Sequence, residues 1–307
     1  MPSNLQAAET SAVGLKDWVW KALAAPGLVW LVLLFVVPFY AILSIAMGRL
    51  HPVLVRPVPE WNPLRWEVGP FGEVWSGLFG GQLGVIAIRT LLYVLAACAL
   101  SVLIGYPVAY FVSRRAGRRK GLFLLLILAP FWINYLMRML AWVNLLSNDG
   151  FVNTTISAFG FAPQDWLGGK PMTVILGLVY GYLPFFILPL YAALDRIDGQ
   201  VLEAARDLGA SARAAFFRVT LPLSKQGVLA GLVIIMLPMF GDYYTPNLLS
   251  GSPRTQLIGN QIDLLVNQTT SQGRHGAALT LILMASVALL MLYYLFNIAR
   301  VTEEARE

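Results

Sequence analysis

The sequence contains little charge and almost no cysteine or histidine. Charged residues make up 12% of its 307 residues, half of the roughly 25% found in soluble domains, so much of the polar surface of a soluble protein is missing. The single cysteine, Cys98, excludes an intrachain disulfide and a cysteine-based metal site. The two histidines, His51 and His275, lie in different predicted loops, which argues against a histidine cluster. We predict no metal site and no catalytic residues.

A phosphate-binding loop is also missing from the sequence. Such a loop reads G-x-x-x-x-G-K-[ST], and the nearest fragment, residues 168–170, lacks the first glycine and the following Ser or Thr. We therefore predict that the chain binds no cofactor and is not an enzyme. Energy for active transport would come from a partner protein.

Apolar residues dominate instead and occur in long runs. Hydrophobic residues make up 58% of the chain. A helix needs roughly 20 apolar residues to cross a bilayer. The first run lacks a signal-peptide cleavage site and is predicted to be an uncleaved span. We predict an all-α integral membrane protein with a segment 1–26, a membrane domain 27–300 and a tail 301–307. Six runs are long enough to span: 27–48, 85–112, 121–146, 172–194, 225–247 and 276–299.

The basic residues predict the orientation of these spans. Fourteen of the 22 Lys and Arg residues fall on one side if both termini are cytoplasmic, as the positive-inside rule requires. The run 113–120 is the strongest marker. The outer loops, 49–84, 147–171 and 248–275, carry six acidic and six basic residues, so they do not by themselves indicate a cationic cargo.

The cytoplasmic loop 195–224 is too long for a simple connector. Its apolar residues recur every three or four positions, which is typical of an amphipathic helix, and Gly209 interrupts the pattern. We predict a short helix, a turn at Gly209, and a second helix that leads to Leu221 and Pro222. Glu203 and Arg206 are spaced to pair on the helix surface.

This loop carries a motif with a fixed spacing. The order E-A-A, three residues, G, nine residues, an aliphatic residue, any residue and L-P resembles the EAA signature of permease subunits in ATP-binding-cassette (ABC) importers. In that family the loop docks on a separate ATPase, and small residues allow the close approach. The residues that match the docking motif, or lie within it, are Glu203, Ala204, Ala205, Arg206, Asp207, Gly209, Val219, Leu221 and Pro222.

The resemblance implies a type I ABC importer permease fold and a set of partners. These are a dimer of ATPases that bind ATP and Mg, a second permease that is a different chain, and an extracytoplasmic substrate-binding protein. It also implies a multi-pass location in the bacterial inner (cytoplasmic) membrane. The net charge of +6 is then explained by cytoplasmic loops that face the bilayer surface, so no nucleic acid is expected.

Three further segments, 129–142, 180–191 and 241–251, resemble spermidine/putrescine permeases, which implies a polyamine cargo. An acid at membrane depth is a functional candidate, and a cation favours acidic and aromatic neighbours. An ion pair between Asp242 and Arg138 would instead make both residues structural. The candidates for the substrate path are Asp242, Tyr243, Tyr244, Trp132 and Tyr135.

Other interpretations stay open at this point. The cargo could be a sugar, phosphate or thiamine-like cation, and a secondary carrier is a further alternative, against which the long loop argues. A membrane enzyme would need a cluster of His, Asp or Glu. The glycine pairs 177/181 and 227/231 predict close helix packing, either within the chain or against a second permease.

Overall fold

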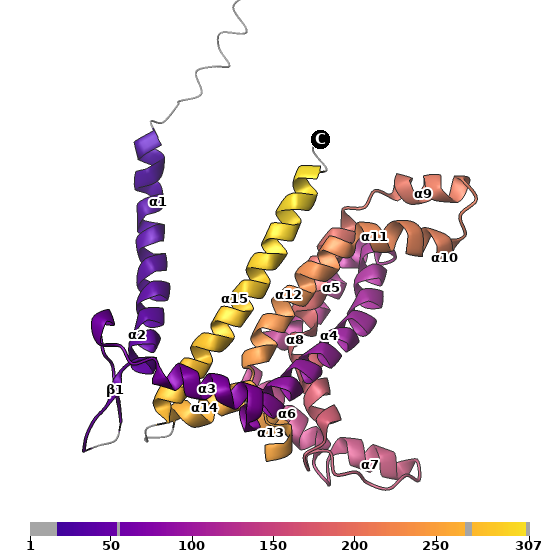
Figure 1. Cartoon of the computed structure of the whole chain (residues 1–307). Coiled ribbons are helices and arrows are strands. Elements are labelled where there is room, and N and C mark those ends of the chain that lie inside the picture. Colours follow the sequence, from indigo (N-terminus) through magenta and orange to yellow (C-terminus); the bar gives the residue numbers. More distant parts are fainter. Residues whose placement is uncertain (1–16, 54–55, 268–271, 305–307) are drawn as a thin grey trace, which may run out of the picture.

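The computed structural model describes residues 17–53, 56–267 and 272–304, and nearly all of its regular structure is helical (Figure 1). Two short strands, β1 (Arg49–Leu50) and β2 (Pro57–Val58), pair antiparallel in one hairpin. The long helices are α1 (Asp17–Leu31), which continues through a π turn (Val32–Val36) into α2 (Val37–Ala46), α4 (Gln82–Arg114), α8 (Pro171–Asp195), α12 (Lys225–Gly241) and α15 (Gly273–Glu304).

Shorter elements connect these helices at both ends of the bundle. The 3-10 turns are η2 (Pro63–Arg65), η3 (Gly117–Arg119), η4 (Ala129–Trp132) and η6 (Pro253–Thr255), and a second π turn is η5 (Phe216–Thr220). The short helices are α3 (Gly69–Gly80), α5 (Lys120–Leu128), α6 (Tyr135–Leu146), α7 (Phe151–Ala158), α9 (Gly199–Asp207), α10 (Ala212–Ala215), α11 (Leu221–Leu223), α13 (Tyr244–Leu249) and α14 (Ile258–Asn267).

Among the described residues, four helical stretches are long and apolar enough to cross a membrane, and six spans result if two bent pairs are counted. This agrees with the six predicted runs. The four continuous stretches are Ala22–Ala46, Gln82–Arg114, Pro171–Asp195 and Gly273–Phe296. The bent pairs are Gly117–Trp132 with Tyr135–Ala158, at 88°, and Ala212–Leu223 with Lys225–Gly241, at 57°.

Two of the predicted runs are not single helices. The run 121–146 breaks where Ile133 adopts an extended backbone and the Asn134 side chain accepts a hydrogen bond from the Leu136 amide, which caps a new helix. The run 225–247 ends at Gly241, because Asp242 leaves helical geometry with ψ 118°. The cause in both places is a polar residue that caps the next helix.

The main core lies between α4, α8 and α12 and centres on Phe186, which is fully buried. A Cβ on Gly105 would lie 2.6 Å from a ring carbon of Phe186, and a Cβ on Gly231 would lie 2.8 Å from another. The glycines therefore let α4 and α12 approach α8 from two sides. Gly177 packs against Leu249 and Gly227 against Ala193, so these predicted close contacts lie within the chain.

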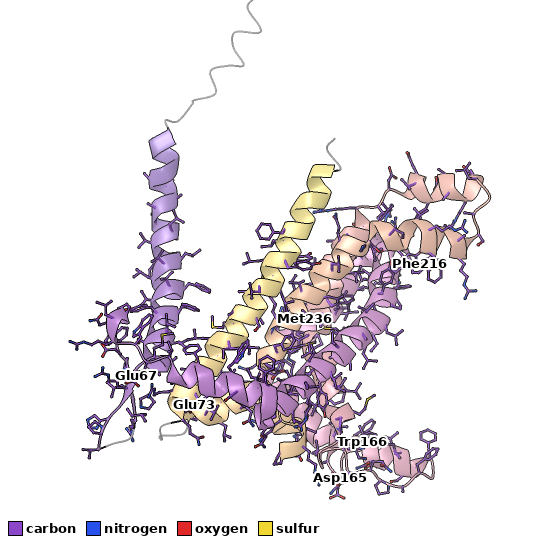
Figure 2. The ribbon with its side chains drawn as sticks, in the orientation of Figure 1. Glu67, Glu73, Asp165, Trp166, Phe216 and Met236 are labelled. Atoms are coloured by element: carbon purple, nitrogen blue, oxygen red, sulfur yellow. The ribbon has the colours of Figure 1, made fainter. Side chains whose placement is uncertain are left out.

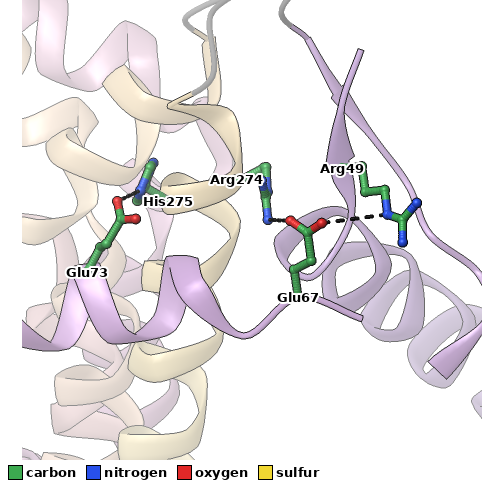
Figure 3. Close-up of polar contacts among 5 residues, drawn as sticks. All are labelled: Arg49, Glu67, Glu73, Arg274 and His275. Atoms are coloured by element: carbon green, nitrogen blue, oxygen red, sulfur yellow. Dashed lines mark hydrogen bonds and ion pairs between the residues drawn. The ribbon is translucent and has the colours of Figure 1, made fainter. Parts of the chain in front are cut away.

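A second core joins α2, α3, α14 and α15 at one end of the bundle. Ion pairs reinforce it, as Figure 3 shows. Glu67 lies 3.6 Å from Arg49 and 3.0 Å from Arg274, and Glu73 lies 2.7 Å from His275. These contacts tie the hairpin and α3 to the start of α15. The described residues of the predicted loop 49–84 therefore form a hairpin and helix α3 that pack on the fold.

Different helices lie at the two ends of the bundle (Figure 1). The start of α1, the end of α15 and the α9–α10 segment lie at one end, and α3, α7 and α14 lie at the other. Figure 2 shows Phe216 near the first end and Trp166 at the opposite one. Both termini lie outside the described residues, but the start of α1 and the end of α15 lie on the side of the 195–224 loop, as predicted. Between the ends, large apolar side chains such as Leu34 and Leu103 are more than 65% exposed, as expected for lipid contact.

Candidate functional site

The segment with the EAA motif forms a helix, a sharp turn and a second helix, as predicted. The Asp198 side chain accepts a hydrogen bond from the Gln200 amide and caps α9. At the other end, the Gly209 amide donates to the Arg206 carbonyl, and Gly209 adopts φ +86°. Ser211 then caps α10 through the Ala214 amide. A positive φ at this turn is strained for residues other than glycine.

Most of the motif faces away from the bundle. Leu208, between the motif residues, is 89% exposed, far more than is usual for an apolar side chain with no partner. The ion pairs of the described residues do not include one between Glu203 and Arg206, and both side chains are exposed. Exposed residues of the motif are Glu203, Ala204, Arg206, Asp207, Gly209, Leu221 and Pro222, and half-buried ones are Ala205 and Val219.

The base of this segment is anchored to the spans by aromatic and polar contacts. Phe216 meets the rings of Tyr106 and Tyr110 edge-on, each at a centroid distance of 5.6 Å. The Tyr106 hydroxyl lies 2.8 Å from the hydroxyl of Ser224, at the start of α12. Lys120 forms an ion pair with Asp195, which joins α5 to the end of α8. Phe216 and Tyr106 thus join the base of this segment to α4 and to the start of α12.

Asp242 lies buried at the break after α12, where its carboxylate accepts hydrogen bonds from hydroxyl groups on three helices. Its carboxylate accepts hydrogen bonds from Tyr135 at 2.8 Å, Tyr182 at 3.3 Å and the Thr245 hydroxyl at 2.6 Å. The Thr245 amide donates to its other oxygen at 3.0 Å, which caps α13. Hydrogen bonds to a carboxylate are shorter and stronger than those between neutral groups. Asp242 thus holds α6, α8 and α13 together.

An open groove of about 320 Å³ lies at Asp242. Tyr243 and Tyr244 stack with ring centroids 4.1 Å apart. Trp132 is 80% exposed and is not among the residues that line the groove. The ion pair between Asp242 and Arg138 that the sequence left open is not among the ion pairs of the described residues. The groove is lined by Tyr135, Tyr182, Pro238, Gly241, Asp242, Tyr243 and Tyr244.

Tyr182 and Thr245 are members of this cluster that the sequence did not single out. Tyr182 lies in the segment 180–191 that carried the family resemblance, but no local pattern shows that it meets a residue 60 positions away. A signal exists only for the position of Thr245, because an aspartate at a helix start accepts a hydrogen bond from an amide two or three positions later.

Comparison with known proteins places this geometry in a family. Residues 101–301 match the model of the binding-protein-dependent transport system inner membrane component. The chain belongs to this family. This permease is 37% identical over 226 residues to the spermidine/putrescine transport system permease protein PotB of Haemophilus influenzae, covering 72% of this chain and 77% of that protein. It is 34% identical over 210 residues to PotB of Escherichia coli K12, covering 68% and 76%.

Solved structures share the fold of the permease. A bacterial ABC transporter involved in the import of the acidic polysaccharide alginate aligns with a TM-score of 0.63 at 20% identity, covering 92% of this chain and 96% of that one. The alginate transporter in complex with an alginate pentasaccharide-bound periplasmic protein aligns with a TM-score of 0.61 at 18% identity, covering 90% and 92%. The predicted family and the all-α permease fold are confirmed.

Proposed function

We propose that this permease forms half of the translocation pathway of a polyamine importer in the bacterial inner membrane, and that a separate ATPase drives it. The observation that carries the proposal is the exposed α9 helix with the EAA spacing, at the opposite end of the bundle from α3, α7 and α14 (Figure 1). The polyamine assignment is supported by the names of relatives that are 34% and 37% identical.

The exposed motif supports an ATPase partner that binds ATP and Mg. Leu208 supplies an apolar contact, Ala204 permits close approach, and Glu203 and Arg206 supply charges for a groove on the partner. We call residues 195–224 the docking segment. Because one chain offers one such segment, a pair of ATPases requires a second permease. The solved neighbour with a bound periplasmic protein supports a substrate-binding protein that docks at the end where α3, α7 and α14 lie.

The Asp242 groove supports a cationic cargo. A buried carboxylate beside tyrosine rings is a suitable site for an ammonium group, because the carboxylate supplies charge and the ring faces attract cations. The groove lies where α12 ends at Gly241. A change in the angle between α12 and α13 would therefore widen or narrow the groove. A neutral sugar or an anionic phosphate would bind less favourably to this lining of carboxylate and tyrosine rings.

Affinity purification of this permease from gently solubilised native membranes tests the proposal. The copurified chains are identified by mass spectrometry, and ATP hydrolysis is measured with candidate binding proteins that carry spermidine or other solutes. We expect an ATPase and a second permease to copurify, and a spermidine-loaded binding protein to raise ATP hydrolysis several-fold.

Two other results would change the assignment. Stimulation by a binding protein loaded with another solute, and none by spermidine, keeps the importer and removes the polyamine cargo. Recovery of the permease without any ATPase, together with spermidine uptake that needs no ATP, identifies a secondary carrier.

A further inference from the structure

Arg138 on α6 is a buried cation without a buried anion. Its side chain is 8% exposed, and its Nε and Nη1 atoms have no hydrogen-bond partner. A guanidinium that is removed from water is costly unless other groups replace its hydration. The neighbouring carboxylate, Asp242, is bound by hydroxyls instead. The charge of Arg138 therefore needs another explanation than a salt bridge within the chain.

Three aromatic rings surround this guanidinium. Its central carbon lies 3.9 Å from the ring centroid of Phe131, 5.4 Å from that of Tyr135 and 5.9 Å from that of Tyr180. The ring of Trp142 contacts that of Tyr180 edge-on, at a centroid distance of 5.2 Å. Ring faces at these distances attract a cation. We call Phe131, Tyr135 and Tyr180 the aromatic box.

The aromatic box and the Asp242 groove share one wall. The ring of Tyr135 faces Arg138, and the hydroxyl of the same ring donates to Asp242 at 2.8 Å. Tyr135 also lines the groove. The aromatic box, which holds the guanidinium of Arg138, thus adjoins Asp242, a carboxylate that pairs with no cation of the described residues. A flexible molecule with two amines could place one amine in the box and the other at Asp242.

We propose that Arg138 is a built-in competitor of the cargo: its guanidinium occupies the aromatic box, which takes one amine of a polyamine when the other amine lies at Asp242. The inference rests on the proposed function, because it needs a cargo with at least two amines. With the pathway empty, Arg138 fills the box and keeps the charge balance beside Asp242. When cargo arrives, the guanidinium leaves, so the site binds weakly and releases its cargo readily.

A second role for Arg138, pairing with a carboxylate of another subunit, fits the structure less well. The side chain is enclosed by rings of its own chain, and 8% exposure leaves little room for a partner side chain to reach it. Such a pairing predicts that removal of the arginine disrupts the complex, whereas competition predicts that cargo binds more tightly.

Binding of radiolabelled spermidine to the purified importer complex in lipid nanodiscs tests the proposal, with no binding protein and no ATP present. Arg138→Met and Arg138→Gln both vacate the box, so each is expected to lower the Kd for spermidine by about threefold or more. Arg138→Lys keeps a cation on the same site and should bind within about twofold of the wild type. Phe131→Leu added to Arg138→Met should cancel the gain, because one face of the box is lost.

Arg89 provides the control, since it is the other arginine within a predicted span and donates to the carbonyls of Pro253 and Gln256. Arg89→Met should not tighten binding. An unchanged or higher Kd in both neutral Arg138 variants overturns the proposal, and so does loss of the second subunit from both. If the wild-type importer takes up no spermidine in cells, the proposed cargo fails and this inference with it. If the wild-type importer takes up spermidine in cells but the Arg138 variants bind it with an unaltered Kd, only this inference fails and the proposed cargo stands.

Discussion

The Tyr106 hydroxyl lies 2.8 Å from the Ser224 hydroxyl, in a fully buried contact that joins α4 to the start of α12. Ser224 also donates to the Leu221 carbonyl, so Tyr106 is the donor to Ser224. Tyr106→Phe keeps the ring against Phe216 and removes only this bond. A buried hydrogen bond contributes about 1 kcal/mol, so the melting temperature of the purified permease should fall by a few degrees.

Tyr110 supplies the matched control for this change. Its ring meets Phe216 at the same 5.6 Å centroid distance, and none of the described hydrogen bonds involves its hydroxyl. Tyr110→Phe should leave the melting temperature unchanged. Equal losses in the two variants would show that the Tyr106 bond contributes nothing specific.

Gly209 should be the one glycine of the docking segment that tolerates no side chain. Its φ of +86° costs an L residue roughly 1–2 kcal/mol. Gly209→Val is expected to misdirect α9 and to reduce the ATPase recovered with the complex, with normal membrane insertion. Gly199→Ala is the control, because a Cβ there also meets no atom within 4 Å but its φ is not positive. Full ATPase recovery with Gly209→Val would contradict the docking role.

The hydroxyls on Asp242 should contribute in the order of their distances. Hydrogen bonds to a charged group contribute about 1.5–3 kcal/mol, and Tyr135 lies at 2.8 Å while Tyr182 lies at 3.3 Å. Tyr135→Phe should therefore lower the melting temperature and spermidine uptake more than Tyr182→Phe. Thr245→Ser keeps its hydroxyl and should resemble the wild type. The reverse order for the two tyrosines would mean that Asp242 is held mainly from α8.

Gly231 marks a close approach of α12 to the buried ring of Phe186. A Cβ there would lie 2.8 Å from a ring carbon of Phe186 and 2.9 Å from its carbonyl oxygen, so Gly231→Ala should destabilise the permease by about 1–3 kcal/mol. Gly121→Ala in α5 meets no atom within 4 Å and should be neutral or stabilising. Thermal unfolding monitored by size-exclusion chromatography measures both variants, and equal melting temperatures would show that α12 can shift freely.

Much of the helical architecture follows from local sequence signals. The run 85–112 corresponds to α4 (Gln82–Arg114), and 172–194 corresponds to α8 (Pro171–Asp195). Helical spacing and Gly209 also predicted the helix and turn of the docking segment. These signals work because a bilayer demands about 20 apolar residues, and because a left-handed turn favours glycine.

The sequence by itself therefore determined the apolar runs, the position of the helix and turn that carry the EAA motif, and the family to which this motif belongs. Only the tertiary structure decided that the run 121–146 bends, because apolarity measures burial or lipid contact and does not report helix direction. It also decided that Tyr135 reaches Asp242 across 107 positions and that Arg138 lies among rings instead of against that acid. Contacts between distant residues depend on how helices pack. The glycine pair 227/231 predicted a close contact, but only the structure shows that Gly231 meets Phe186.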